Sequence, residues 1–256
     1  MMYNCTGYLH GKDDYDWIDE RMDPEIVLKA AQAAYPGFNP HSWSWTELPN
    51  QGRQGACQGH ALANCFQIAL VQQYGIQTLF SRAAAYYLSQ KFDGIHGDRG
   101  STLSGGQKVA ESGLCLEVEW AYPSSYNNRQ PESANGNLNF KMMGSRRVKD
   151  ADLAWDLLKA GVPIQTGVAW NSSFEREVCD SYRSGGGGHS TMLFGLDEET
   201  GNAINHNSWG SNWCGDGRNQ WTKKFFSDII QRDRYAVFVA YDPTGLEVPE
   251  GFDDRL

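Results

Sequence analysis

The two halves of this sequence follow different hydrophobic patterns, and this division limits the folds that the chain can adopt. Segments with the apolar spacing of helices are 57–74, 81–92, 102–113 and 148–161. Strand-like runs rich in β-branched and aromatic residues are 162–170, 189–197, 203–210 and 235–242. A helical half followed by a mainly β half predicts an α+β fold, with two lobes that face each other across a cleft.

The domain boundaries follow from the same patterns. We expect an N-terminal arm over residues 1–45 and one domain over 46–256. Within that domain, we expect the helical lobe at about 46–135 and the β-rich lobe at about 136–256. Residues 123–137 are rich in Ser, Asn, Gly and Pro, which predicts a linker between the lobes.

The arm is polar, acidic and aromatic, and we expect it to be irregular apart from a short helix over 23–37. Asp23 would cap this helix and Pro24 would lie in its first turn. A strand-like alternation follows at 41–48. The sequence leaves open whether the arm packs on the lobes or lies in the cleft.

Composition excludes several classes of function. The 256 residues carry a formal net charge of −9, which argues against non-specific binding to nucleic acid or to an anionic membrane. No apolar run reaches the ~20 residues of a membrane span, and the first residues lack the basic and apolar regions of a signal peptide. We therefore expect a cytoplasmic protein. Its 6 cysteines form no CxxC pair, so free thiols are expected rather than disulfides or a metal site.

A glycine-rich approach to a cysteine is the first candidate for chemistry. Residues 50–65 read NQGRQGACQGHALANC, and Cys57 stands where the predicted helix begins. The N-terminus of a helix carries partial positive charge and unpaired N–H groups, which favour a reactive thiolate. A cysteine that only packs needs no glycines around it. Cys65 lies on the apolar stripe of the same helix, and we expect it to be structural.

Two histidines are candidates for the base that activates this thiol. His189 follows four glycines and opens an apolar strand, so a substrate could pass close to its ring. His60 lies three residues after Cys57 on the same helical face. A base on the nucleophile's own helix leaves little room for a substrate between lobes, so His189 is preferred and His60 is the alternative.

Two amides and one indole complete the candidate site. The side-chain oxygen of Asn207 could accept a hydrogen bond from the imidazole, and Trp209 could cover that bond from water. Gln51 precedes Cys57 by six residues (57 − 51), and its side chain could join the Cys57 backbone N–H in holding an oxyanion.

These motifs resemble those of papain-like cysteine peptidases. QGRQGAC at 51–57 is similar to the family's QGxCGSC, and HNSWGSNWCGDG at 206–217 is similar to NSWGxxWGexG. The separations from Cys57 are 132 residues to His189 (189 − 57) and 150 to Asn207 (207 − 57), within the family's usual range of about 130–150. The segment 97–123 is similar to the matching block of bacterial and viral members. The likeness spans 45 to about 245.

The resemblance implies a fold and a role for each residue. It implies a two-lobe fold whose C-terminal lobe is β-barrel-like, with the active site in the cleft. The implied catalytic roles are nucleophile for Cys57, acid and base for His189, orienting group for Asn207 and oxyanion donor for Gln51. The implied substrate-binding residues are Gly100, Ser101, Gly188 and Trp209. Gln54 stands where secreted members have a half-cystine, so that disulfide is absent.

The function implied is that of a cysteine endopeptidase that acts on proteins or peptides through a thioester acyl-enzyme. No metal or organic cofactor is needed, and a monomer is the family default. Two alternatives remain at this stage. One is a peptidoglycan amidase or endopeptidase on a papain-like fold, and the other is a papain-like binding module without catalytic activity.

Overall fold

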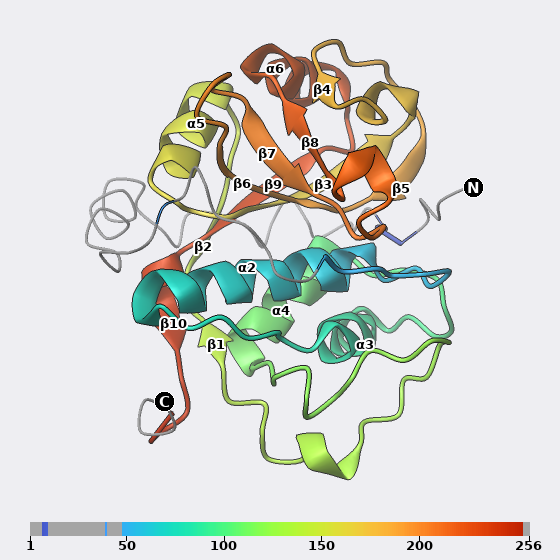
Figure 1. Cartoon of the computed structure of the whole chain (residues 1–256). Coiled ribbons are helices and arrows are strands. Elements are labelled where there is room, and N and C mark those ends of the chain that lie inside the picture. Colours follow the sequence, from blue (N-terminus) through green and yellow to red (C-terminus); the bar gives the residue numbers. More distant parts are fainter. Residues whose placement is uncertain (1–6, 10–38, 40–47, 253–256) are drawn as a thin grey trace.

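The computed structural model describes residues 7–9, 39 and 48–252. Two lobes are visible in Figure 1, with the three long helices of the first half below a sheet that carries two further helices above it. The predicted α+β class, with a helical N-terminal lobe and a β-rich C-terminal lobe, is confirmed. The predicted helix at 23–37 and nearly all of the strand-like stretch at 41–48 lie outside the described residues.

The helical lobe is built from three capped helices. These are α2 (Cys57–Tyr74), α3 (Arg82–Asp93) and α4 (Leu103–Ser112), as the apolar spacing predicts. The side chains of Ser81 and Thr102 cap α3 and α4 by accepting N–H bonds from Ala84 and Gly105. Gly75 ends α2 in the left-handed conformation. None of the helices in the described residues combines the length and the apolar character needed to cross a membrane.

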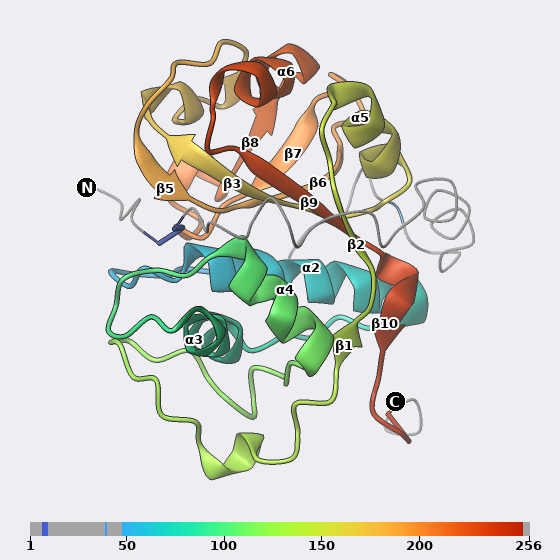
Figure 2. The same ribbon diagram turned by 180° about the vertical axis from the view of Figure 1, so that it is seen from behind.

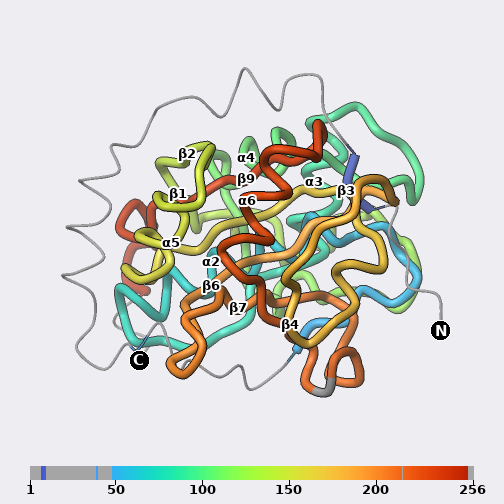
Figure 3. The backbone as a smooth tube through the Cα atoms, turned by 90° about the horizontal axis from the view of Figure 1, so that it is seen from above, coloured from blue at the N-terminus to red at the C-terminus, as the bar shows by residue number. Residues whose placement is uncertain are grey.

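The β-rich lobe is one open sheet with strand order β2-β9-β3-β6-β7-β8-β4, and β5 pairs with β3 beside this path. The strands are β2 (Ser145–Arg147), β3 (Ile164–Trp170), β4 (Val178–Cys179), β5 (Gly187–His189), β6 (Met192–Leu196), β7 (Ala203–His206), β8 (Arg218–Trp221) and β9 (Val237–Tyr241). Among the described strands no pairing joins β2 to β4, so the sheet does not close into the expected barrel. Helices α5 (Ala151–Lys159) and α6 (Lys223–Arg232) belong to this lobe, and Figure 3 shows it from above.

Alternate residues of the sheet strands enter two different apolar cores. Met192 and Phe194 on β6 pack with the helices of the first lobe, whereas Leu193 between them belongs to the core formed with α5 and α6. Phe238 on β9 likewise faces the second core. The sheet is therefore covered by α2 on one face and by α5 and α6 on the other, which places the N-terminus of α2 directly beneath the strands.

The chain passes between the lobes later than the sequence suggests. Residues 123–137 are not a linker but belong to the helical lobe: the Pro123 carbonyl accepts a bond from Gln54, and the Asn127 N–H donates to the Tyr87 hydroxyl. Strand β1 (Lys141–Met142) also lies there and pairs with β10 (Leu246–Glu247), as Figure 2 shows from behind. The last described residues thus return to the helical lobe.

Several short elements were not predicted. They are β1, β2, β4, β8, β10 and α6, together with the 3₁₀ turns Glu132–Ala134, Ser172–Phe174, Trp213–Gly215 and Pro243–Gly245. Helix α6 has a recognisable signal, because Thr222 accepts the N–H of Phe225 as a cap, and both Phe225 and Ile229 are buried four residues apart.

Gly59 gives a test of the packing between α2 and α3. A Cβ at Gly59 would lie 2.6 Å from the backbone nitrogen of Tyr86 and 2.8 Å from its Cα. Glycine to alanine in a helix interior normally stabilises by about 1 kcal/mol, but here the two helices would have to separate. We expect Gly59→Ala to lower the free energy of unfolding by about 1–3 kcal/mol in urea denaturation. An unchanged or raised midpoint would contradict this packing.

Candidate active site

Cys57 is the first residue of α2 and is fully buried. No side chain caps this helix end at Ala56, so the partial positive charge of the first turn is available to the thiol. The loop that precedes Cys57 is fixed to the rest of the helical lobe, because the Gly55 N–H donates to the Asp98 carboxylate at 2.8 Å. Cys57 therefore lies at the N-terminus of a helix, as the sequence predicts.

His189 ends β5 and is enclosed by two indoles. The Trp209 ring stacks on the imidazole with centroids 4.6 Å apart, and the edge of Trp170 meets it at 4.7 Å. The predicted contact with Asn207 is present, since Nε2 of His189 lies 2.8 Å from Oδ1 of Asn207. Trp170 was not among the predicted residues, although its place at the end of a buried strand marks it as a core residue near β5.

The hydrogen bonds to Asn207 fix the tautomer of His189. Oδ1 of Asn207 also accepts the backbone N–H of Ser208 at 2.8 Å, so this atom is an acceptor in both contacts. Nε2 of His189 must then donate, and Nδ1 is the acceptor nitrogen. Nδ1 is buried and has no hydrogen-bond partner among the described residues. The ring is thus oriented with its basic nitrogen available for another group.

Burial controls the charge of this imidazole. Removal from water lowers the pKa of His189 to about 4, and the hydrogen bond to Asn207 opposes that shift only in part. The ring is therefore neutral at pH 7 unless a negative charge forms beside it.

Gln165 joins the segments that carry Cys57 and His189. Its Nε2 donates to the backbone carbonyl of Gln58 at 3.0 Å and lies 3.4 Å from the hydroxyl of Ser190. Gln58 follows Cys57 and Ser190 follows His189, so this one buried side chain links the two lobes at the site. Sequence reasoning missed it, but a glutamine inside an otherwise apolar strand was the available signal.

Gln51 is buried, and both the oxygen and the nitrogen of its side-chain amide form hydrogen bonds. Oε1 accepts the hydroxyl of Ser208 at 2.5 Å, and Nε2 donates to the Gln54 carbonyl at 2.8 Å. The Gln51 N–H also donates to the Ser208 carbonyl at 2.8 Å. The loop before Cys57 is therefore fixed to the segment that carries Asn207. Ser208 was not predicted to orient Gln51.

His60, the alternative base, is a buried core residue. Its Nδ1 lies 3.0 Å from the Ala56 carbonyl in the first turn of its own helix, and Tyr122 packs edge-on against its ring at 4.5 Å. Burial, followed by the positive charge of Arg82, lowers the pKa of His60 to about 3. These contacts give the ring a packing role.

Residues 7–9 lie across the candidate site, between the lobes. The Ser101 N–H donates to the Gly7 carbonyl at 3.0 Å, and the Leu9 N–H donates to the Ser101 carbonyl at 2.9 Å. From the other lobe, the Gly188 carbonyl accepts the Tyr8 N–H at 3.4 Å. The segment is blue in Figure 1, beside β5. Ser101 and Gly188, both predicted to bind substrate, thus bind a backbone segment of this same chain.

Gly100 lies next to this segment. Its N–H donates to the Tyr86 hydroxyl at 3.1 Å, and Gln90 donates to its carbonyl at 2.9 Å. Gly100 therefore holds the loop rather than the backbone of residues 7–9 in this structure.

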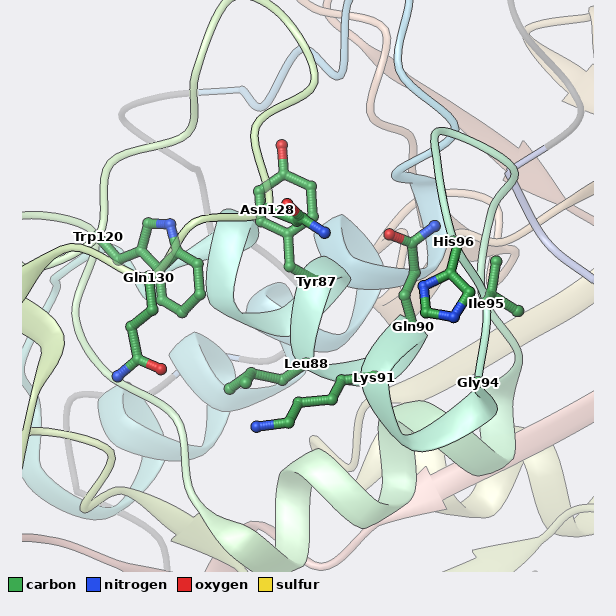
Figure 4. A pocket seen from close by; sticks show the side chains of 10 residues that line it. All are labelled: Tyr87, Leu88, Gln90, Lys91, Gly94, Ile95, His96, Trp120, Asn128 and Gln130. Carbon is green, nitrogen blue, oxygen red and sulfur yellow. The ribbon is translucent and has the colours of Figure 1, made fainter.

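A separate hollow of about 280 Å³ lies on the helical lobe. Figure 4 shows side chains from α3 on one side and Trp120, Asn128 and Gln130 on the other. It contains none of the predicted site residues. No cluster of three or more His, Cys, Asp or Glu placed for a metal ion occurs in the described part of the chain, and its five cysteines are free thiols.

Comparisons with known proteins agree with this arrangement. No model of a known protein family matches the sequence. Over 228 residues the chain is 26% identical to an uncharacterized peptidase C1-like protein of Acanthamoeba polyphaga mimivirus, covering 77% of this chain and 73% of that protein. The fold of this chain is similar to that of xylellain, a cysteine protease from Xylella fastidiosa, with a TM-score of 0.74. The two chains are 21% identical, and the match covers 93% of this chain and 96% of xylellain.

A second solved structure extends the likeness. Digestive procathepsin L 3 of the Tenebrio molitor larval midgut has a TM-score of 0.62 and 16% identity, over 86% of this chain and 79% of that one. Together these findings confirm the resemblance to papain-like cysteine peptidases and the papain-like fold.

The charge state of His189 can be measured directly. We expect NMR titration of ¹³C-labelled histidine in the Cys57→Ala chain, where no thiolate can form, to place the pKa of His189 near 4, because the ring is buried. The unfolded value is about 6.5, so the unfolded chain binds more protons between the two values. The contribution of His189 to stability is then full above pH 6.5 and is lost as the pH falls toward 4.

Asn207→Ala is the matched variant for this titration. It removes the hydrogen bond that raises the pKa of His189, so the pKa should fall further. A pKa near 6.5 in the Cys57→Ala chain, or no further fall when Asn207→Ala is added to it, would contradict the burial and contact described for this ring.

Proposed function

We propose that this chain is a cysteine endopeptidase that hydrolyses peptide bonds through a thioester acyl-enzyme. Cys57 is the nucleophile, His189 is the general acid and base, Asn207 orients His189, and Gln51 helps to hold the oxyanion. The observation that carries the proposal is the buried 2.8 Å contact between His189 and Asn207, which leaves Nδ1 as the acceptor nitrogen. The papain-like fold and the peptidase C1-like relative support the same activity.

In the first step, the Cys57 thiol transfers its proton to Nδ1 of His189. The cost of charging a buried imidazole is offset by the thiolate beside it and by the N-terminus of α2. The thiolate then attacks the substrate carbonyl carbon, and the C=O bond becomes a C–O⁻ bond. In this proposal the backbone N–H of Cys57 and the side-chain amide of Gln51 donate hydrogen bonds to that oxygen.

In the second step, the tetrahedral intermediate collapses. The imidazolium of His189 gives its proton to the leaving amine, the C–N bond breaks, and a thioester to Cys57 remains. Water then attacks the thioester while Nδ1 of His189 accepts its proton. Collapse of the second intermediate releases the acid and returns the proton to Cys57.

The roles of Ser101 and Gly188 extend to the substrate. An extended peptide could use the Ser101 N–H and C=O on one side and the Gly188 carbonyl on the other, as residues 7–9 do. A substrate must therefore displace that segment. The five free thiols of the described residues suit work in a reducing compartment such as the cytoplasm.

Cys57→Ala is the first test of this mechanism. We expect it to lower turnover of an unfolded protein substrate roughly 10⁴-fold or more, because no other cysteine in the described residues begins an α-helix. The half-exposed Cys214 is the matched control, and Cys214→Ser should retain activity. Purified peptidoglycan, assayed in parallel, tests the alternative cell-wall chemistry.

The remaining roles predict smaller losses. Gln51→Ala should lower kcat roughly 10²–10³-fold, as the loss of an oxyanion donor does in other hydrolases.

Full activity in Cys57→Ala would rule out the mechanism. Absence of turnover on every substrate, with Cys57 no more reactive toward an epoxide than free cysteine, would instead favour a binding module.

A further inference from the structure

One carboxylate oxygen of Asp98 joins two loops at the candidate active site. The first loop precedes Cys57, and its Gly55 N–H donates to Oδ1 of Asp98 at 2.8 Å. The loops also touch through their backbones, since a Cβ built on Gly55 would lie 3.0 Å from the backbone nitrogen of Gly100. The cysteines of the described residues are free thiols, so no disulfide among them ties these loops together. The bond from Gly55 to Asp98 is a direct polar link between them.

Tyr86 fixes the position of that oxygen. Tyr86 is fully buried on α3, and its hydroxyl donates to the same Oδ1 of Asp98 at 2.8 Å. The hydroxyl oxygen accepts the N–H of Gly100 and the side-chain amide of Gln90, both at 3.1 Å. Burial, followed by the hydrogen bond to Asp98, raises the pKa of Tyr86, so the hydroxyl keeps its proton and remains a donor. A buried group of the helical lobe therefore holds Asp98 in place.

The peptide unit between Gln54 and Gly55 connects Asp98 to Gln51. Its N–H donates to Asp98, and its carbonyl accepts Nε2 of Gln51 at 2.8 Å. The unit is planar and trans, so its N–H and its carbonyl point in opposite directions and turn only together. A bond that fixes the N–H therefore also fixes the carbonyl. Because an amide nitrogen carries two N–H groups, holding one of them at Gln54 sets the direction of the other.

We propose that Asp98 is a positioning residue for the oxyanion hole. It orients the Gln54–Gly55 peptide, and through that peptide it sets the direction of the Gln51 amide. The inference rests on the proposed function, in which Gln51 donates to the oxyanion. In this role Asp98 acts on the reaction without contacting the reacting atoms.

Both bonds to Asp98 end on one oxygen, which separates the effect of geometry from the effect of charge. Asparagine keeps an oxygen that can accept both bonds and loses only the negative charge, whereas alanine loses the acceptor as well. The side chain of Asp98 is exposed, so neither substitution opens a cavity in the core. Asp98→Asn is therefore the matched variant for Asp98→Ala.

The first experiment measures kcat and KM of the full chain on an unfolded protein substrate. We expect Asp98→Ala to lower kcat roughly 10–10²-fold, which is less than the loss in Gln51→Ala, because the amide is still present but no longer oriented. KM should change less than about threefold, since the change falls on a group that acts in the transition state. Asp98→Asn should recover most of the lost kcat.

Asp242→Ala is the control for the loss of a loop carboxylate. Oδ1 of Asp242 also accepts one N–H and one hydroxyl, both from Thr244. Its turn, Pro243–Gly245, is bonded to Gln73 near the other end of α2 from Cys57. The kcat of this variant should equal that of the unaltered chain. Urea denaturation of each variant shows that the compared chains are folded.

A double-mutant cycle tests whether Asp98 acts through Gln51. In the Gln51→Ala chain the amide is absent, so adding Asp98→Ala should lower kcat by less than about twofold. A purely structural role of Asp98 would lower kcat by the same factor in both backgrounds. Equal losses in the two backgrounds, no loss in either, or a loss that Asp98→Asn does not recover would overturn the inference.

The second experiment needs no turnover. NMR of the ¹⁵N-labelled chain follows the exchange of the Gln51 side-chain amide with water, and the signal is assigned by its loss in Gln51→Ala. We expect Asp98→Ala to raise this exchange rate roughly tenfold or more, and Asp98→Asn to leave it near that of the unaltered chain. An unchanged rate in Asp98→Ala would overturn the inference. Absence of cleavage by the unaltered chain, with the exchange rates as expected, would contradict the proposed function and still support the positioning of Gln51 by Asp98.

Discussion

The site depends on how the first turn of α2 is held against the sheet. This junction is buried, and a hydrogen bond from a sheet residue crosses it. Gln165 on β3 donates to the Gln58 carbonyl and accepts the hydroxyl of Tyr241 at 3.0 Å. A buried amide left unpaired costs about 1–3 kcal/mol, so these bonds favour a single relative position of helix and strands. The junction therefore fixes the positions of Cys57 and of the segment that carries His189.

A second constraint is the opposition between burial and charge. The indoles around His189 protect its bond to Asn207, but the same enclosure lowers its pKa and disfavours the imidazolium that the proposed mechanism needs. In the proposed mechanism the thiolate offsets this cost, because its negative charge would form together with the positive charge of the ring. Residues 7–9 add to the enclosure while they lie over the sulfur. Their departure would admit a substrate and water at the same time.

Much of this arrangement could be predicted from the sequence, because it depends on patterns of neighbouring residues. The bounds of α2, α3, α4 and α5 follow from apolar spacing and caps, and the strands β3, β6, β7 and β9 follow from short apolar runs. Cys57 was placed at a helix start by its glycines. The His189–Asn207 contact was first suggested by the chemistry of an amide oxygen beside an imidazole and was then implied by the resemblance, since spacing within one strand does not define a partner in space.

The features that escaped prediction depend on contacts between distant segments. The 123–137 stretch has the composition of a linker, yet its backbone is bonded to Gln54 and Tyr87, which no local pattern reveals. Ser208 and Gln165 act through partners more than 100 residues away in sequence. The close approach of Gly7 to the sulfur, where a Cβ on Gly7 would lie 2.6 Å from Sγ of Cys57, is of the same kind. The β-barrel-like form of the C-terminal lobe was implied by the resemblance, and the pairing between β2 and β4 that would close a barrel is not found among the described strands.

The central claim is that the Cys57 thiol shares a proton with His189 across the junction of the lobes. The most direct measurement is the rate of Cys57 alkylation as a function of pH, in the unaltered chain and in His189→Ala. We expect reactivity in the unaltered chain to persist well below pH 7, and in His189→Ala to be lost as the pH falls below 7 because the base that accepts the proton is absent. The same pH profile in both chains would contradict it.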